Sequence, residues 1–561
     1  MSSEKTKWIA TTLVVILGVA GGFWLARDIV GLGKDRTKKV AAPPRPIRQF
    51  DGPNAPTKSE PRHASRRSPK IEDLLFGIPN ERIVRFSSDS AYRNFLSKLD
   101  GKKLRLLGKL DALRAARVGY TNLDDLEDLL DDDDETYGNY RVAIPELPQV
   151  DAQPGAVAFG RATLEWLGIT GDNSSWGEGV RIAMLDTGVG QHAAFPEGIR
   201  EIDLITGDGP PIDLHGHGTA VASLLVGSDD ISQGIAPAAE LLSIRIGDDA
   251  GASNSFLLAE GIVLAVDEGA QIINISMGSY GDSALVRDAI AYATDHQVVI
   301  IAAAGNEGIE TPAYPAAYEG VIAVGAVDGS GQHLDFSNTG DSIDLAAPGY
   351  EIVSAWPDDQ FTSFSGTSAS SPIVVGAIAA TMSELGPMPV GAATEIVMEN
   401  LNAAGAPGED PQYGEGNIDI GRVMQSETPG ILDLAVASNW YEPPSESEVV
   451  GSLLVTVENR GTAAISGATI DVSIGNNIFP MTIASLQPGA TQVLTLAVNA
   501  PTSIESIAIN SMLNMNGTAD SDPTNNSLAG QIVLITESPS EVAAANPPLP
   551  TGPVTPQPDN Q

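Results

Sequence analysis

The chain has 561 residues and no cysteine, so disulfide bonds, thiolate nucleophiles and cysteine-ligated zinc are excluded. Its 72 Asp and Glu residues outnumber its 32 Lys and Arg residues, which gives a formal net charge of −40. Such an acidic surface disfavours nucleic acid as a partner, and the length indicates several domains.

The N-terminal 30 residues contain an uncharged apolar stretch from Trp8 to Leu25, preceded by Lys5 and Lys7. Its 18 residues are close to the minimum for a membrane-spanning helix, and the flanking lysines are also typical of a signal peptide. Residues 1–30 are therefore predicted to be a signal peptide or a membrane anchor. We expect an extracytoplasmic protein, either held in the membrane by residues 8–25 or secreted after cleavage.

Residues 31–71 are rich in Pro, Arg, Lys and Ser and show no apolar periodicity, which predicts a basic, flexible linker. Residues 80–147 then alternate strand and helix patterns. The expected strands are 82–86, 104–113, 115–120 and 139–145, and the expected helices are 88–99 and 122–130. The order βαββαβ predicts a small α+β domain of the ferredoxin-like type.

Residues 155–425 alternate strands and helices over a longer range, which predicts an α/β domain with a parallel sheet. A buried-strand pattern, Val180 to Leu185, ends at Asp186, where open α/β sheets carry their sites. His217 precedes a helix of small residues. Asp186 could equally be a capping residue in a turn, and Asp213, His215 and His217 could form a metal site.

Two further segments carry chemistry. The strand pattern from Gln297 to Ala304 runs into Asn306, whose amide could donate to an oxyanion or belong to an ordinary turn. Ser368 lies in the sequence Gly-Thr-Ser-Ala-Ser-Ser-Pro at the start of an Ala-rich helix pattern. A serine there meets free backbone N–H groups and the positive end of the helix dipole, which suits a nucleophile as well as a helix cap.

The combination of these motifs resembles the subtilisin-like serine peptidases, the subtilases. The motifs are Asp-Thr-Gly at 186, Gly-His-Gly-Thr around 217, Ala-Ala-Ala-Gly-Asn-Glu-Gly around 306 and the serine motif at 368. Their order along the chain is that of the family. The resemblance implies an α/β catalytic domain with a subtilisin-like parallel sheet over residues 155–425, with polypeptides as substrates.

By this resemblance, Ser368 is the nucleophile, His217 the general base and Asp186 the residue that orients the imidazole, while Asn306 donates to the oxyanion. The family also implies two segments that flank a substrate strand and part of a specificity pocket. The residues concerned are Gly251, Ala252 and Ser253; Ser276, Met277 and Gly278; and Ala303, Ala304 and Gly305. Small residues in the pocket predict cleavage after large apolar residues. The acidic domain predicts some tolerance of Lys or Arg and little of Asp or Glu at the same position.

Departures from the family qualify these expectations. Ala369 stands where a methionine commonly follows the nucleophile. The segment 227–233 is shorter than the calcium-binding loop of bacterial subtilisins, and Asp229 and Asp230 are better read as solvated carboxylates than as calcium ligands. No cofactor is expected for the chemistry, a structural calcium ion stays a weak alternative, and no metal site is assigned.

The remaining regions complete the expected plan. By position, residues 80–147 resemble a subtilisin propeptide, which acts as an inhibitor and a folding chaperone. Residues 430–535 have alternating patterns typical of an all-β sandwich and resemble Ig-like modules of the CARDB type, and residues 536–561 form a Pro-rich tail expected to be disordered. The main prediction is an exported serine endopeptidase made as a zymogen. The alternative is a catalytically silent adhesion or peptide-binding protein.

Overall fold

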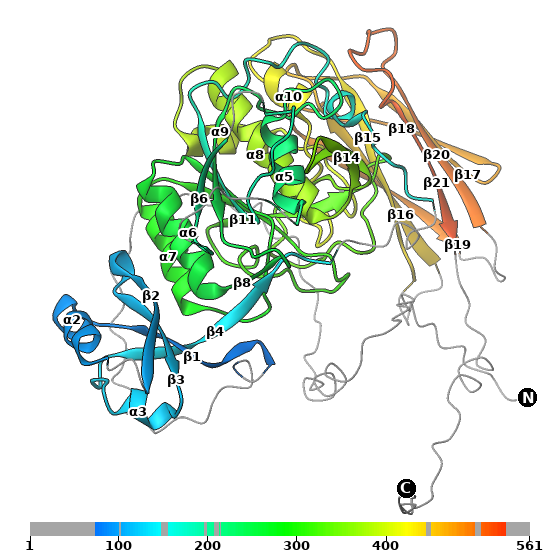
Figure 1. Cartoon of the computed structure of the whole chain (residues 1–561). Coiled ribbons are helices and arrows are strands. Elements are labelled where there is room, and N and C mark those ends of the chain that lie inside the picture. The colour runs from blue at the N-terminus through cyan, green and yellow to red at the C-terminus, as the bar shows by residue number, and fades with distance from the viewer. Residues whose placement is uncertain are drawn as a thin grey trace, which may run out of the picture.

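The computed structural model describes residues 73, 75–99, 103–146, 155–195, 199–206, 213, 215–444, 450–499 and 506–533. These residues form an N-terminal α+β unit, a central α/β domain and a C-terminal β-sandwich (Figure 1). The predicted signal or anchor segment, the basic linker and the Pro-rich tail lie outside the described residues. Within the described ranges, no helix is long and apolar enough to cross a membrane.

The N-terminal unit has the order β1 (Gly77–Arg85), α2 (Asp89–Lys98), β2 (Leu104–Leu110), β3 (Ala115–Tyr120), α3 (Leu123–Glu127) and β4 (Glu135–Ala143). Its strands lie in the order β2-β3-β1-β4. Side chains of Ser88 and Asn122 cap the two helices by accepting from backbone N–H groups of the first turn. A small core that includes Phe86, Phe95 and Leu126 closes the unit.

One strand of this unit is shorter than predicted. The expected strand 104–113 ends at Leu110, because residues Asp111–Leu113 turn into a 3₁₀ helix and Arg114 takes a left-handed conformation with φ of 49°. The tight turn reverses the chain directly into β3, which pairs antiparallel with β2. Strand-like sequence patterns lie on both sides of this turn, so sequence periodicity did not predict it.

The central domain is built on seven parallel strands in the order β12-β11-β10-β9-β5-β7-β6. The strands are β5 (Arg181–Asp186), β6 (Arg200–Asp203), β7 (Glu240–Arg245), β9 (Ile272–Ile275), β10 (Val299–Ala303), β11 (Val321–Val327) and β12 (Leu345–Pro348). The helices are α4 (Thr163–Trp166), α5 (His217–Val226), α6 (Ser255–Asp267), α7 (Ala284–Asp295), α8 (Thr367–Glu384), α9 (Val390–Glu399) and α10 (Ile420–Gln425). A short strand, β8 (Ala252–Asn254), and a hairpin of β13 (Ile352–Trp356) and β14 (Gln360–Phe364) complete the domain.

Both faces of this sheet are buried, which explains its nearly continuous apolar strands. Ile182 and Met184 of β5 point to one core together with α5, α8 and α9. Their neighbours Ala183 and Leu185 point to the other core with α6 and α7. Successive side chains of a strand therefore pack alternately against the helices on the two faces of the sheet. The carboxyl ends of the parallel strands lie at one edge of the sheet.

The C-terminal unit is a sandwich of a three-stranded sheet, β15-β16-β19, and a four-stranded sheet, β18-β17-β20-β21. The strands are β15 (Leu434–Glu442), β16 (Val450–Asn459), β17 (Thr469–Ile474), β18 (Asn477–Thr482), β19 (Thr491–Asn499), β20 (Ser506–Asn514) and β21 (Ser527–Val533). One apolar core that includes Leu453, Ile470 and Ile509 lies between the sheets. The alternating patterns at 451–458, 468–474, 492–498 and 504–511 predict β16, β17, β19 and β20 within a few residues, whereas β15, β18 and β21 were not predicted.

A buried ion cluster joins the sandwich to the central domain. The Glu458 carboxylate of β16 accepts from Arg422 of α10 at 2.6 Å and from Arg460 at 3.1 Å. Its second oxygen also accepts from the backbone N–H of Ala403 at 3.0 Å. Because the Glu458 side chain is only 3% exposed, these donors satisfy a charge that water does not reach.

Candidate active site

The motif residues come together where strands end and helices begin at one edge of the central sheet. Asp186 is the last residue of β5, His217 is the first residue of α5, and Ser368 is the second residue of α8. Gly366 precedes α8 with φ of 130°, a conformation that favours glycine, and a Cβ atom there would lie 2.8 Å from the Asn306 amide. The glycine thus lets the serine turn approach the Asn306 side chain.

Asp186 and His217 form a buried pair. Asp186 Oδ1 lies 2.8 Å from His217 Nδ1, and the two side chains are 0% and 2% exposed. The same oxygen accepts from the Thr187 backbone N–H at 2.8 Å. When Nδ1 carries the proton toward Asp186, Nε2 is left with a lone pair, and no described protein atom bonds to it.

Ser368 is 1% exposed and lies on the first turn of α8. Its hydroxyl donates to the Ser276 carbonyl at 3.2 Å, and the Ser276 hydroxyl donates back to the Ser368 carbonyl at 3.2 Å. This reciprocal pair holds the start of α8 against the segment that follows β9. Among the hydrogen bonds of the described residues, none joins the Ser368 hydroxyl to the free nitrogen of His217.

Asn306 has a fixed orientation. Its Oδ1 accepts from the backbone N–H and the hydroxyl of Thr367, both at 2.9 Å. The amide nitrogen is thereby turned outward, and it donates to the backbone carbonyl of Glu146 at 3.3 Å. Thr367 also accepts from the Gly305 N–H at 3.0 Å, so this threonine ties the Asn306 turn to the serine turn. The sequence argument did not identify Thr367, although it directly precedes the serine.

The chain's own segment before residue 147 lies as an extended strand between the two predicted substrate-flanking segments. β4 pairs antiparallel with β8, with Val142 opposite Ser253 and Ala143 opposite Ala252. Ala143 exchanges two hydrogen bonds of 2.9 Å with Gly278, and the Ile144 N–H donates to the Gly251 carbonyl at 3.0 Å. Figure 1 shows β4 leaving the N-terminal unit and running along β8.

The residues proposed for a pocket wall are packed rather than open. Ala303, Ala304 and Gly305 are buried at the end of β10, and the Met277 side chain is also buried. Next to them Glu307 accepts hydrogen bonds from the Tyr280 hydroxyl and, at 3.0 Å, from the Asn338 amide. Burial raises the pKa of Tyr280, and the negative charge of Glu307 raises it further.

The expected metal alternatives find little support in the geometry. Asp229 Oδ1 accepts from the Ile231 N–H at 2.7 Å, as in an ordinary Asx turn. The Asp213 carboxylate is directed at backbone and hydroxyl donors rather than at the two histidine rings. Within the described ranges, no three His, Asp or Glu side chains are grouped to hold a metal ion.

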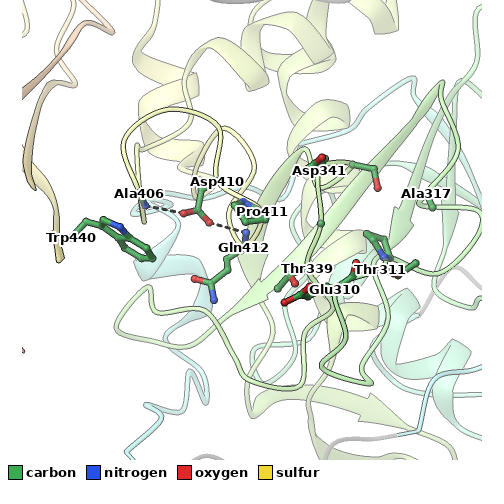
Figure 2. A pocket seen from close by; sticks show the side chains of 13 residues that line it. Glu310, Thr311, Ala317, Thr339, Asp341, Ala406, Asp410, Pro411, Gln412 and Trp440 are labelled. Atoms are coloured by element: carbon green, nitrogen blue, oxygen red, sulfur yellow. Dashed lines mark hydrogen bonds between the residues drawn. The ribbon is translucent and has the colours of Figure 1, made fainter. Parts of the chain in front are cut away.

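A pocket in the described part of the chain lies away from these residues. It has a volume of about 880 Å³ and opens between the central domain and the sandwich. Figure 2 shows Trp440 of β15 on one side and the loops that carry Glu310, Asp341 and Asp410 on the other. None of the motif residues lines it, so the chemistry of the site is not built on this pocket.

Comparison with known proteins finds one matching family and several relatives. Residues 177–416 match the profile of the subtilase family. The thermophilic serine proteinase of Bacillus sp. strain AK1 is 38% identical over 218 residues, which are 38% of this chain and 54% of that protein. Subtilisin DY of Bacillus licheniformis is 31% identical over 255 residues (44% of this chain, 92% of the relative), and thermitase of Thermoactinomyces vulgaris is 37% identical over 205 residues (36% and 74%).

Proposed function

The chain belongs to the subtilase family and is a subtilisin-like serine endopeptidase, and from this premise we propose that Asp186, His217 and Ser368 are its catalytic triad. The buried 2.8 Å contact between Asp186 and His217 supports this assignment. It favours an enzyme over a silent adhesion protein, because peptide binding alone has no need of a buried acid–base pair beside a serine.

In the proposed reaction, Ser368 Oγ attacks the carbonyl carbon of the scissile bond while His217 Nε2 takes its proton. The C–N bond then breaks, His217 gives the proton to the leaving amine, and an acyl-enzyme remains on Ser368. Water then attacks the ester carbonyl while the same nitrogen takes its proton, the acyl bond to Ser368 Oγ breaks, and His217 gives the proton to Ser368 as the acid product leaves. Asp186 keeps Nδ1 protonated and stabilises the imidazolium that forms in each step.

Asn306 is proposed to bind the oxyanion together with the backbone N–H of Ser368. The 3.3 Å hydrogen bond from its amide to the Glu146 carbonyl carries this assignment, since a scissile carbonyl would accept the same donor. The two hydrogen bonds from Thr367 fix the donor before any substrate arrives. Such preorganisation makes the donor effective when charge develops on the oxygen.

We further propose that the protein is made as a zymogen, with a propeptide within residues 80–147, a catalytic domain within 155–425 and the sandwich within 430–535. The end of β4 and residues 144–146 support this, because they pair with β8 and Gly278 and bring the Glu146 carbonyl to the Asn306 amide, as an extended substrate would. The bond after Glu146 is the proposed site of self-cleavage. A propeptide that ends near residue 147 predicts self-cleavage between about Pro145 and Gly160, and this bond lies within that window.

Contacts away from the cleft support an inhibitory role for the N-terminal unit. Asn139 of β4 accepts from the Phe256 N–H and the Ser255 hydroxyl at the start of α6. Arg85 of β1 forms a 2.7 Å ion pair with Asp288 of α7. These contacts hold the sheet of the unit on the two helices beside the cleft, and thus keep its last strand in place.

The proposed substrates are extended polypeptides, and cleavage after large apolar residues stays a prediction. Glu146 is an acidic residue at the position before the proposed first cut, and its side chain is exposed. An exposed Glu146 side chain gains no buried contact in the cleft, so this segment should be cleaved slowly. Slow cleavage suits a segment that acts as an inhibitor. Export is also part of the proposal and rests on the apolar segment from Trp8 to Leu25.

The test uses the full chain and its Ser368→Ala variant. The wild-type protein should react with a fluorophosphonate probe, hydrolyse unfolded protein and yield a new N-terminus at or shortly after residue 147. The variant should fold, remain unlabelled and keep its original N-terminus. A variant that retains wild-type turnover would exclude Ser368 as the nucleophile, and an active wild-type enzyme that still starts before residue 80 would exclude the propeptide.

A further inference from the structure

Asp213 is a buried carboxylate that the proposed reaction does not use. It lies four residues before His217 and is 1% exposed. It accepts five hydrogen bonds from four residues. Oδ1 accepts from the Thr187 hydroxyl at 2.9 Å and from the N–H groups of His215 and Gly216 at 3.1 and 2.8 Å, and Oδ2 accepts from the Thr219 N–H and hydroxyl at 2.9 and 2.6 Å. All five partners are donors, an arrangement that suits a carboxylate.

Part of this network holds the start of α5. Gly216 is the N-cap residue of the helix and has no side chain with which to cap it. Asp213 takes over that task by accepting from Gly216 and from Thr219 in the first turn, near the positive end of the helix dipole. The backbone that carries His217, the first helical residue, is therefore fixed by the Asp213 carboxylate.

The other part of the network holds the turn after β5. The Thr187 hydroxyl lies 2.9 Å from Asp213 Oδ1 and 3.3 Å from Asp186 Oδ1, so its single proton is directed at Asp213. The Thr187 backbone N–H donates to Asp186 Oδ1 at 2.8 Å. The hydroxyl oxygen also accepts from the Gly218 N–H at 3.1 Å, which ties the turn to α5.

We propose that Asp213 is a positioning residue for the reaction, which sets the alignment of Asp186 and His217 by holding the segment of each. The inference rests on the proposed triad. Asp213 forms no hydrogen bond with the segments 251–253 and 276–278 that flank the substrate strand, among the bonds of the described residues. Its loss should therefore act on turnover more than on substrate binding.

The first test is Asp213→Asn in the full chain, which keeps the size of the side chain. If its oxygen keeps the Oδ1 bonds, its NH₂ group faces the Thr219 N–H, so donor meets donor and the helix loses the Thr219 part of its cap. We expect kcat to fall by about tenfold to a hundredfold, as for other residues that orient a histidine from outside the reacting groups, with KM changed by less than about twofold. The low-field proton NMR signal of the Asp186–His217 hydrogen bond should shift or broaden.

Asp328→Asn is the matched control. Asp328 is 2% exposed and accepts from Val157, Ser330 and Gln332, but from none of the residues around the acid–base pair. Both variants should lower the melting temperature. Only Asp213→Asn should lower kcat and alter the NMR signal.

Thr187 provides a second route if Asp213→Asn fails to fold. Thr187→Ser keeps the hydroxyl and should retain wild-type kcat, whereas Thr187→Val removes it and should lower kcat. Folded Asp213→Asn or Thr187→Val protein with wild-type kcat overturns the inference. A wild-type protein that no fluorophosphonate labels instead overturns the proposed function, so the two failures are distinguishable.

Discussion

Replacing Asn306 with alanine separates two roles that its amide combines. The Nδ2 group is the proposed oxyanion donor, and its removal should lower kcat by about 10²–10³, which corresponds to about 2.7–4 kcal/mol of transition-state stabilisation. The Oδ1 atom is the acceptor for the N–H and the hydroxyl of Thr367, which is fully buried. Leaving those donors without an acceptor should cost about 1–3 kcal/mol of folding stability.

Asn306→Asp distinguishes the two effects. An aspartate keeps an acceptor for Thr367 and should therefore fold with nearly wild-type stability, but it offers the oxyanion a negative charge instead of a donor. We expect kcat at least as low as for the alanine variant, with the melting temperature restored. Steady-state kinetics on a peptide substrate and thermal unfolding of the Ser368→Ala background measure the two quantities. A loss confined to KM, or full turnover in Asn306→Asp, would refute the oxyanion assignment.

Three further predictions concern charged residues. Arg422→Met leaves the Glu458 carboxylate with one ionic partner and should destabilise the junction by about 3 kcal/mol, measured by denaturant unfolding of the Ser368→Ala protein; an unchanged midpoint would contradict it. Burial raises the pKa of Glu201 from 4.5 to about 7, so the folded protein binds this proton more tightly than the unfolded chain. The free energy of unfolding should therefore decline as pH rises from about 4.5 to 7, and Glu201→Gln should reduce that slope. Glu146→Leu should speed self-cleavage, timed by gel electrophoresis, and slower cleavage would indicate a true preference for acidic residues.

Short sequence motifs located the residues that the structure brings to one edge of the central sheet. Asp186 ends a strand, Asn306 follows one, and His217 and Ser368 lie in the first turns of helices. Parallel strands bring their carboxyl ends to one edge of the sheet. The supporting network could not be found this way. In the sequence, Asp213 stood out only as part of a possible metal site. Its partners in the structure are backbone N–H groups and threonine hydroxyls, which no sequence motif marks.

The fold was predictable to a similar depth. Apolar runs such as Val180–Leu185 identified the buried strands, and Ser88 and Asn122 marked two helix starts through their capping chemistry. The sequence did not predict contacts between residues that lie far apart along the chain. Glu458 reads as the end of an alternating strand, and only the approach of Arg422 from α10 explains why a charge is tolerated there.

β4 belongs to the N-terminal unit and also pairs with β8 along the cleft, so cutting the chain would change how strongly the unit blocks the proposed active site. While the chain is intact, the N-terminal unit is tethered to the cleft, and a short tether gives an effective concentration of about millimolar. Once the bond after Glu146 is cut, the same contacts must hold two separate molecules. Occupancy of the cleft then depends on dilution, so a concentrated stock should remain inhibited while the same preparation becomes active when diluted.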